Sequence, residues 1–174
     1  MFTIRRAELS DLEFLRAFAE HTFRITYEAQ NDPKAFNDYC AEAFDLDCVR
    51  AELLHPHSEF YFACQGEERV AYQKFNFDRH PPEIGSERTL QVQRIYIAPA
   101  FQGQGLGRQL LDFAQQRATH ADLDWVWISV WQKAPQTVIF YQRCGFEIFG
   151  TELFPLGDDP QSDWLMRRSV DKQP

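Results

Sequence analysis

A run of glycines between a predicted strand and a predicted helix constrains the fold of this chain most. Residues 102–107 read Gln-Gly-Gln-Gly-Leu-Gly. Residues 90–98 before them alternate like a strand, and Leu106, Leu110 and Phe113 after them follow helical spacing. Glycines at such a junction let the backbone turn tightly and approach a ligand. The free N–H groups of the first helical turn, together with the helix dipole, favour a phosphate or pyrophosphate there.

The glycine turn alone leaves other interpretations open, including a tight turn that binds nothing. A dinucleotide-binding turn usually opens a βαβ unit, and an acidic ribose ligand ends the next strand. Here the turn comes late, and the next strand ends in Val130, Trp131 and Gln132, with no acid. A Walker A loop is excluded because no Gly-Lys-Ser/Thr follows.

The remaining periodicities place strands and helices on both sides of this junction. Helices are predicted from Asp11, with Ser10 as its cap and Glu13 completing a capping box, from Pro33, after Asp45, and from Pro135 to Cys144, closed by Gly145. Strands are predicted over 2–6, 59–65, 69–77, 90–98, 125–131, 146–152 and 163–168, with a loop over 155–160. We therefore expect one α/β domain over residues 1–174.

Composition narrows the class of protein. The chain has 18 Lys and Arg against 26 Asp and Glu, a net charge of −8, which argues against nucleic acid as a partner. Such a charge suits a polycationic substrate, although many cytosolic proteins are acidic for solubility. Cys40, Cys48, Cys64 and Cys144 form no metal-binding pattern and are expected to be core thiols in a reducing cytoplasm. No apolar run approaches the ~20 residues of a membrane span.

Two motifs carry a family resemblance. Gln102-x-x-Gly105-x-Gly107 is similar to the Gln/Arg-x-x-Gly-x-Gly/Ala signature of the GCN5-related N-acetyltransferase (GNAT) superfamily. Residues 140–146, Phe-Tyr-Gln-Arg-Cys-Gly-Phe, resemble its second hallmark, and residues 94–99 resemble its fourth strand. The resemblance implies an α/β fold with a mixed, mostly antiparallel, twisted sheet of about seven strands flanked by helices.

A closer resemblance is to bacterial spermidine/spermine N-acetyltransferases of the PaiA type. It rests on residues 94–97, 130–133 and 155–163, and on Thr22-Phe23 followed by Asn31-Asp32-Pro33. This resemblance implies acetyl-CoA as co-substrate, no metal, and a small amine, first of all a polyamine, as acceptor. Dimers are common in the superfamily, so the resemblance leaves a homodimer open.

The resemblance also assigns roles to residues. The pyrophosphate would lie on the amides of Gln102, Gly103, Gln104, Gly105, Leu106, Gly107 and Arg108, and the pantetheine arm on the backbone of Ile95, Tyr96 and Ile97. The Ile97 N–H would polarise the thioester carbonyl, and Tyr141 would protonate the departing thiolate. Gln136 stands where many members carry an Asn that binds CoA.

The base and the acceptor site are less determined. Relatives often carry Glu on the fourth strand, where this chain has Gln91 and Gln93, whose amides can position a water but take no proton. Tyr72, Tyr96, His80, Glu87 and a water chain stay open as alternatives. We expect Glu28, Asp32, Asp38 or Glu42 to line a pocket for the cationic acceptor near the first two helices. Gln93 and Trp131 are expected to bind the acceptor as well.

Three readings of function follow. The first is acetyl transfer to a polyamine. The second keeps acetyl-CoA and changes the acceptor to a protein N-terminus, an aminoglycoside or an amino acid. The third is a non-catalytic acetyl-CoA-binding module, which the missing Glu on the fourth strand would favour.

Overall fold

The strands of the chain form a single sheet. The structure is a computed structural model that describes residues 2–156 and 159–171. Within these residues, the sheet has seven strands in the order β1-β2-β3-β4-β5-β7-β6. The strands are β1 (Thr3–Arg6), β2 (Ser58–Gln65), β3 (Glu68–Asn76), β4 (Thr89–Ile97), β5 (Trp125–Trp131), β6 (Glu147–Leu156) and β7 (Asp159–Ser169). Only the β4–β5 pair among them is parallel. The predicted mixed, mostly antiparallel sheet is confirmed.

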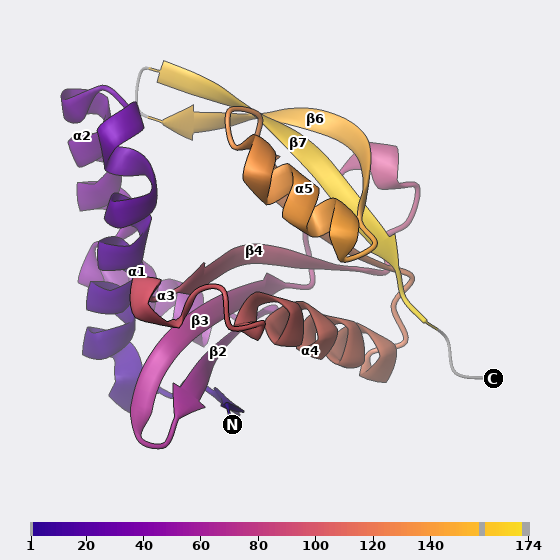
Figure 1. The fold of residues 1–174 in the computed structure, drawn as a ribbon, viewed down its shortest axis with the longest axis horizontal. Helices are drawn as coiled ribbons and strands as arrows, with labels where there is room; N and C mark the ends of the chain where they lie inside the picture. Colours follow the sequence, from indigo (N-terminus) through magenta and orange to yellow (C-terminus); the bar gives the residue numbers. More distant parts are fainter. Residues whose placement is uncertain (1, 157–158, 172–174) are drawn as a thin grey trace.

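Helices cover both faces of this sheet. They are α1 (Leu12–Tyr27), α2 (Pro33–Ala43), α3 (Leu46–Leu54), α4 (Leu106–His120) and α5 (Pro135–Arg143). Because side chains alternate along a strand, β2 sends Phe60 and Phe62 to one face, where they pack with α1 to α3, and Tyr61 to the other. On that second face α4 and α5 pack on Val126 and Val130 of β5. Figure 1 shows α1 to α3 gathered at the left of the molecule, with α4 and α5 toward its centre and right.

The pairing between β4 and β5 ends after three residue pairs. The last pair is Gln91 with Trp127, and beyond it β4 stays with β3 while β5 stays with β7. The β3–β4 register also shifts, because Lys74 opposes Arg94 while Phe75 opposes Val92. Gln93 is thus the extra residue of a β-bulge, which bends β4. Figure 1 shows β4 and the β6–β7 hairpin converging toward one end and lying apart near α1 and α2.

Two local predictions were wrong. A 3₁₀ turn over Leu9–Asp11 precedes α1, so Asp11 rather than the predicted Ser10 stands at the N-cap of α1. The Asp11 carboxylate accepts the Glu8 N–H at 3.0 Å in the capping box of this turn, in place of the predicted box with Glu13. Asp11 takes this place because the guanidinium groups of Arg5 and Arg69, each 2.8 Å away, hold its carboxylate there.

The predicted loop over 155–160 is also wrong at its two ends, because Pro155 pairs with Pro160 inside the β6–β7 hairpin. Residues 157–158 of that loop lie outside the described residues. The β5–β7 pairing ends at Asp163, so β7 has only β6 as a described neighbour at Pro160. The missing N–H of a proline is tolerated in such an edge position.

A buried charge cluster fixes β4 against β3 and α3. The carboxylate of Glu52 on α3 accepts from Lys74 at 2.7 Å and from Arg94 at 2.6 and 3.1 Å. Both cations are nearly covered, with side-chain exposures of 5% and 12%. Burial would raise the pKa of Glu52, but Arg94 and Lys74 outweigh it and hold that pKa below its ordinary value.

We expect Glu52→Gln to lower the free energy of unfolding by about 3 kcal/mol, because it leaves two buried cations without a counter-charge. Urea unfolding measures the change. The matched control is Glu147→Gln, which removes an exposed carboxylate paired with Arg167 and should cost less than about 0.5 kcal/mol. Equal effects of the two substitutions would contradict the structural role of the cluster.

Candidate active site

The glycine turn leaves open space in front of α4. Gly103 and Gly105 have φ angles of +74° and +79°, and a β-carbon on either would meet no atom within 4 Å. The hydrogen bonds of α4 begin with Gln109 N–H to the Gly105 carbonyl at 3.2 Å. The N–H groups of residues 106–108 come before this bond, so they lack an acceptor inside the helix. An anion placed at this turn would meet free N–H groups and the positive end of the helix dipole.

Gly107 has a different role from the two glycines before it. A β-carbon there would lie 3.0 Å from the ring of Phe140 on α5 and 3.6 Å from Ile97 on β4. Close packing rather than a turn therefore favours glycine at this position, because the Phe140 ring would have to give way to a larger residue. The contact joins the two sequence motifs directly, because Phe140 precedes Tyr141 in the second one.

The side chains of the predicted cofactor segment hold the turn in place. Gln102 donates to the Ile97 carbonyl and Gln104 donates to the Ala100 carbonyl, each at 3.0 Å. Leu106 is buried in the core, while Arg108 is exposed. Gln136 is exposed in the first turn of α5. The backbone of the segment is thus better placed than most of its side chains to contact a ligand.

The free edge of β4 carries unpaired backbone groups. Tyr96 pairs with Tyr72 of β3, and the N–H of Ala98 donates to Val70 at 2.9 Å, which places Ala98 N–H on the β3 side. Because backbone groups alternate between the two edges of a strand, the N–H groups of Ile95 and Ile97 point to the other edge. That edge has no β5 partner after Gln91. An extended, amide-bearing ligand can pair there as an additional strand would.

Tyr141 lies on the α4–α5 face of the sheet. It is 5% exposed, and its ring lies 5.8 Å from that of Phe146. Burial raises the pKa of Tyr141 far above its ordinary value, and neighbouring Tyr27 of α1 adds to the rise. The phenol is therefore protonated at neutral pH and can serve as a proton donor.

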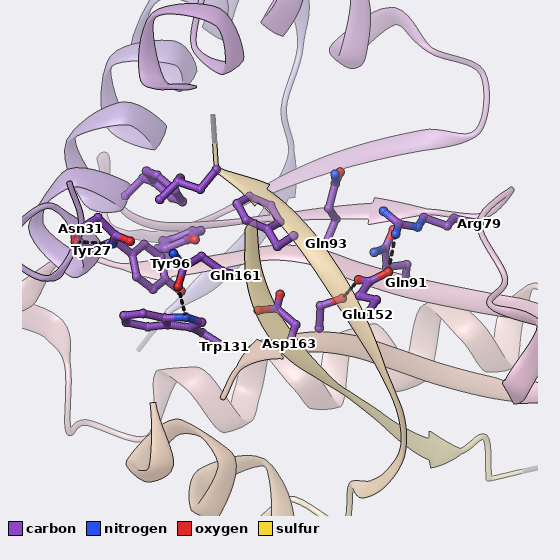
Figure 2. A pocket seen from close by; sticks show the side chains of 14 residues that line it. Tyr27, Asn31, Arg79, Gln91, Gln93, Tyr96, Trp131, Glu152, Gln161 and Asp163 are labelled. Atoms are coloured by element: carbon purple, nitrogen blue, oxygen red, sulfur yellow. Dashed lines mark hydrogen bonds and ion pairs between the residues drawn. The ribbon is translucent and has the colours of Figure 1, made fainter. Parts of the chain in front are cut away.

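A pocket opens on the opposite face, between α1, β4, β5 and the β6–β7 hairpin (Figure 2). Its aromatic wall comprises Phe23, Tyr27, Tyr96, Trp131 and Phe154. Tyr27 meets Trp131 and Tyr96 edge-on, with ring centroids 6.0 and 6.5 Å apart. Trp131, which the sequence predicts to be an acceptor-site residue, lines this pocket and donates its ring N–H to Gln161 at 2.9 Å.

Two carboxylates enter the pocket from directly opposed positions. Glu152 of β6 and Asp163 of β7 are partners in the strand register. Glu152 accepts from Arg79 at 2.7 Å and from the hydroxyl of Ser129. Asp163 is 8% exposed, and within the described part of the chain no hydrogen bond or ion pair reaches its carboxylate. Burial, and after it the charge of Glu152, raises the pKa of Asp163 to about 6.

The glutamines of β4 also line the pocket. The amide of Asn76 donates to Gln91 at 2.8 Å and to Gln93 at 3.0 Å. Gln93, which the sequence predicts at the acceptor site, lines this pocket and is the extra residue of the β4 bulge. Figure 2 shows Gln91 beside Arg79 and Glu152, with the Gln93 side chain directed away from Glu152.

The acidic residues predicted from α1 and α2 lie outside this pocket. Glu28 is exposed and pairs with Arg24 at 2.9 Å, and Asp32 caps α2 by accepting the Ala35 N–H at 2.9 Å. The acids that line it, Glu152 and Asp163, were missed because the first ended one predicted strand and the second began the next. Pairing those two strands as a hairpin would have brought them together.

Among the described residues, none of the helices has the length and apolar character of a membrane span, and no group of three or more His, Cys, Asp or Glu could hold a metal ion. The four cysteines form no disulfide; Cys40, Cys64 and Cys144 are buried as predicted, whereas Cys48 is exposed.

Comparison with known proteins agrees with this geometry. Residues 15–146 match the model of the acetyltransferase (GNAT) family. The chain is 30% identical over 160 residues, 92% of each sequence, to an uncharacterized N-acetyltransferase in the pepI 3′ region of Lactobacillus delbrueckii subsp. lactis.

Two similar solved structures share the whole fold. The PaiA N-acetyltransferase of Thermoplasma acidophilum, in complex with coenzyme A, has a TM-score of 0.75 at 17% identity, covering 97% of this chain and 99% of that one. The spermidine N-acetyltransferase of Vibrio cholerae, in complex with CoA and spermine, has a TM-score of 0.72 at 21% identity, covering 98% and 96%. The family match over most of the chain, together with the separated strands and the glycine turn, shows that this protein belongs to the GNAT family and is an acetyl-CoA-dependent N-acetyltransferase.

Proposed function

We propose that the enzyme transfers the acetyl group of acetyl-CoA to a primary amine of a polyamine such as spermidine or spermine. The observation that carries this proposal is the pocket at the point where β4 and β5 separate, which combines an aromatic wall with two carboxylates and one guanidinium. Its formal charge is negative, and aromatic faces attract cations. The similar structures of spermidine N-acetyltransferases support the same acceptor class.

Acetyl-CoA would bind from the face opposite the acceptor. The free N–H groups of residues 106–108 would hold its pyrophosphate, and the free edge of β4 its pantetheine arm. The N–H of Ile97 would donate to the thioester carbonyl, since it points to that edge while its own carbonyl is occupied by Gln102. Acetyl-CoA supplies the activated acyl group.

The two faces meet where the strands part. The acceptor nitrogen would attack the thioester carbon from the aromatic pocket, and the carbon–sulfur bond would break. Tyr141 would give its proton to the leaving thiolate, because its raised pKa keeps the phenol protonated until that charge develops. Tyr27 and Tyr96 would hold the methylene chain of the acceptor along the aromatic wall.

A homodimer and a cytoplasmic location belong to the same proposal. The absence of a disulfide among the four cysteines is compatible with a reducing compartment. The edge strand β6 exposes Leu153 at 70%, which is compatible with a partner.

Incubation with acetyl-CoA and spermidine or spermine should release free thiol at a rate that saturates with the amine. The panel also includes an N-terminal peptide, an aminoglycoside and free amino acids. Thiol release with one of these and none with polyamines would replace the proposed acceptor. Tight acetyl-CoA binding without transfer to any amine would contradict a catalytic role.

Gly105→Ala should weaken acetyl-CoA binding on the order of 10-fold, because it strains a left-handed position and places a methyl group in the anion site. Calorimetry measures the dissociation constant. Gly66→Ala is the matched control, since Gly66 has a φ of +62° with no atom near its missing β-carbon and lies in the β2–β3 turn. A similar loss of affinity in both variants would argue against the anion site.

Tyr141→Phe should lower kcat by ~10-fold or more and leave acetyl-CoA affinity nearly unchanged, because only the proton donor is removed. The control is Tyr61→Phe, which removes a phenol from the same apolar cluster where it bonds to Glu59. An unchanged kcat in the Tyr141 variant would remove this residue from the mechanism.

A further inference from the structure

Acetyl transfer to an amine requires a group that takes up a proton. The nitrogen of a free primary amine carries two protons and the amide product keeps one, so the other must leave as the nitrogen–carbon bond forms. Tyr141 is protonated and gives its proton to the leaving thiolate, so it is not the group that takes up the proton of the amine. Strand β4 contributes the amides of Gln91 and Gln93 to the pocket, and an amide cannot accept a proton at neutral pH.

Only the carboxylates of the pocket remain as strong candidates among its described lining residues, and the structure distinguishes them. Glu152 is bound by Arg79 at 2.7 Å and by Ser129. Hydrogen bonds and a positive charge both stabilise an ionised carboxylate and make it a weak base. From the described residues Asp163 receives neither, although it is more deeply buried than Glu152.

The surroundings of Asp163 suit a base. Trp131 of β5 and Glu152 of β6 flank it as partners in the strand register. Tyr27 of α1 and Tyr96 of β4 line the same pocket, and burial raises the pKa of Tyr27 with a further contribution from the charge of Asp163. The remaining charged group of the lining is Arg79, which is already paired with Glu152. Figure 2 shows the Asp163 carboxylate directed into the pocket between Trp131 and Glu152.

We propose that Asp163 is the general base of the reaction, a role that rests on the proposed transfer to an amine. The acceptor nitrogen, as the free amine, forms its bond to the thioester carbon and loses one of its two protons to a carboxylate oxygen of Asp163. The carbon–sulfur bond breaks, and the sulfur takes the proton of Tyr141. Asp163 then releases its proton to solvent through the pocket, and Tyr141 regains one, so that amide and CoA are the products.

This assignment places base and acid on opposite faces of the sheet. Asp163 approaches from the pocket under α1, and Tyr141 from the face covered by α5. The gap between β4 and β5 is where both can reach one thioester. Glu152 has a supporting role, because its charge disfavours ionisation of Asp163 and so makes Asp163 a stronger base.

The pH dependence has a defined sign. The base must be deprotonated, and burial with the charge of Glu152 raises the pKa of Asp163 to about 6. Activity should therefore fall as the pH drops through that value. Glu152→Gln removes the neighbouring negative charge and should move this acid limb to lower pH.

The experiment measures kcat and KM of the wild type and of Asp163→Asn over a range of pH. We expect kcat of the variant to fall about 100-fold and its acid limb to disappear. Asp163→Glu, which keeps a carboxylate, should recover part of kcat and restore the limb. An acetyl-CoA dissociation constant equal to that of the wild type reports that Asp163→Asn is folded.

Two results would overturn the assignment. One is an Asp163→Asn variant whose kcat and acid limb match those of the wild type. The other is a rise of KM alone, which would make Asp163 an anchor for the cation and not a base. The comparison uses whichever amine of the panel the wild type acetylates, so that failure of polyamines refutes the proposed acceptor without touching the base. A wild type that acetylates no amine refutes both.

Discussion

The separation of β4 from β5 is the constraint on which the rest of the site depends. A parallel pair normally continues as long as both strands last, but here it ends at Gln91 and Trp127. Each strand keeps its other neighbour, so the sheet remains continuous while its middle opens. The opening exposes backbone N–H groups that would be costly to leave unpaired in a closed interior, and a ligand that resembles a strand can satisfy them.

Keeping the opening rigid requires anchors on both sides. On the β4 side, the bulge at Gln93 redirects the strand, and the cluster of Glu52, Lys74 and Arg94 ties it to α3. On the β5 side, β7 pairs along the whole strand, from Trp125 to Trp131. The same β7 carries Asp163, so the strand that supports one wall also places a reactive group in the pocket.

Sequence reasoning predicted the elements well where periodicity was strong and missed contacts set by tertiary structure. The glycine turn, the helix after it and Pro135 as a helix start follow from local rules that hold in any context. Ser10 is not the cap because it lies inside the 3₁₀ turn before α1, whose capping box uses Asp11, a carboxylate that Arg69, 58 residues away, also binds. Glu28 and Asp32 looked suitable by position in the sequence, but both are used locally, by Arg24 and by the α2 backbone. The acids of the pocket become neighbours only through the register of a hairpin, which a single sequence does not state.

The contact between Gly107 and Phe140 has a consequence for how such a protein can change over generations. Helix α4, which begins at the anion site, and helix α5, which carries Tyr141, approach each other at Gly107, where an added β-carbon would lie only 3.0 Å from the end of the Phe140 ring. A larger residue at position 107 requires either the Phe140 ring or one of the two helices to move, and a helix shift would displace the phosphate-facing amides relative to the phenol. The two positions should therefore change together. Related sequences with a larger residue at position 107 are expected to have a smaller one at position 140, and a change at only one of them should be rare.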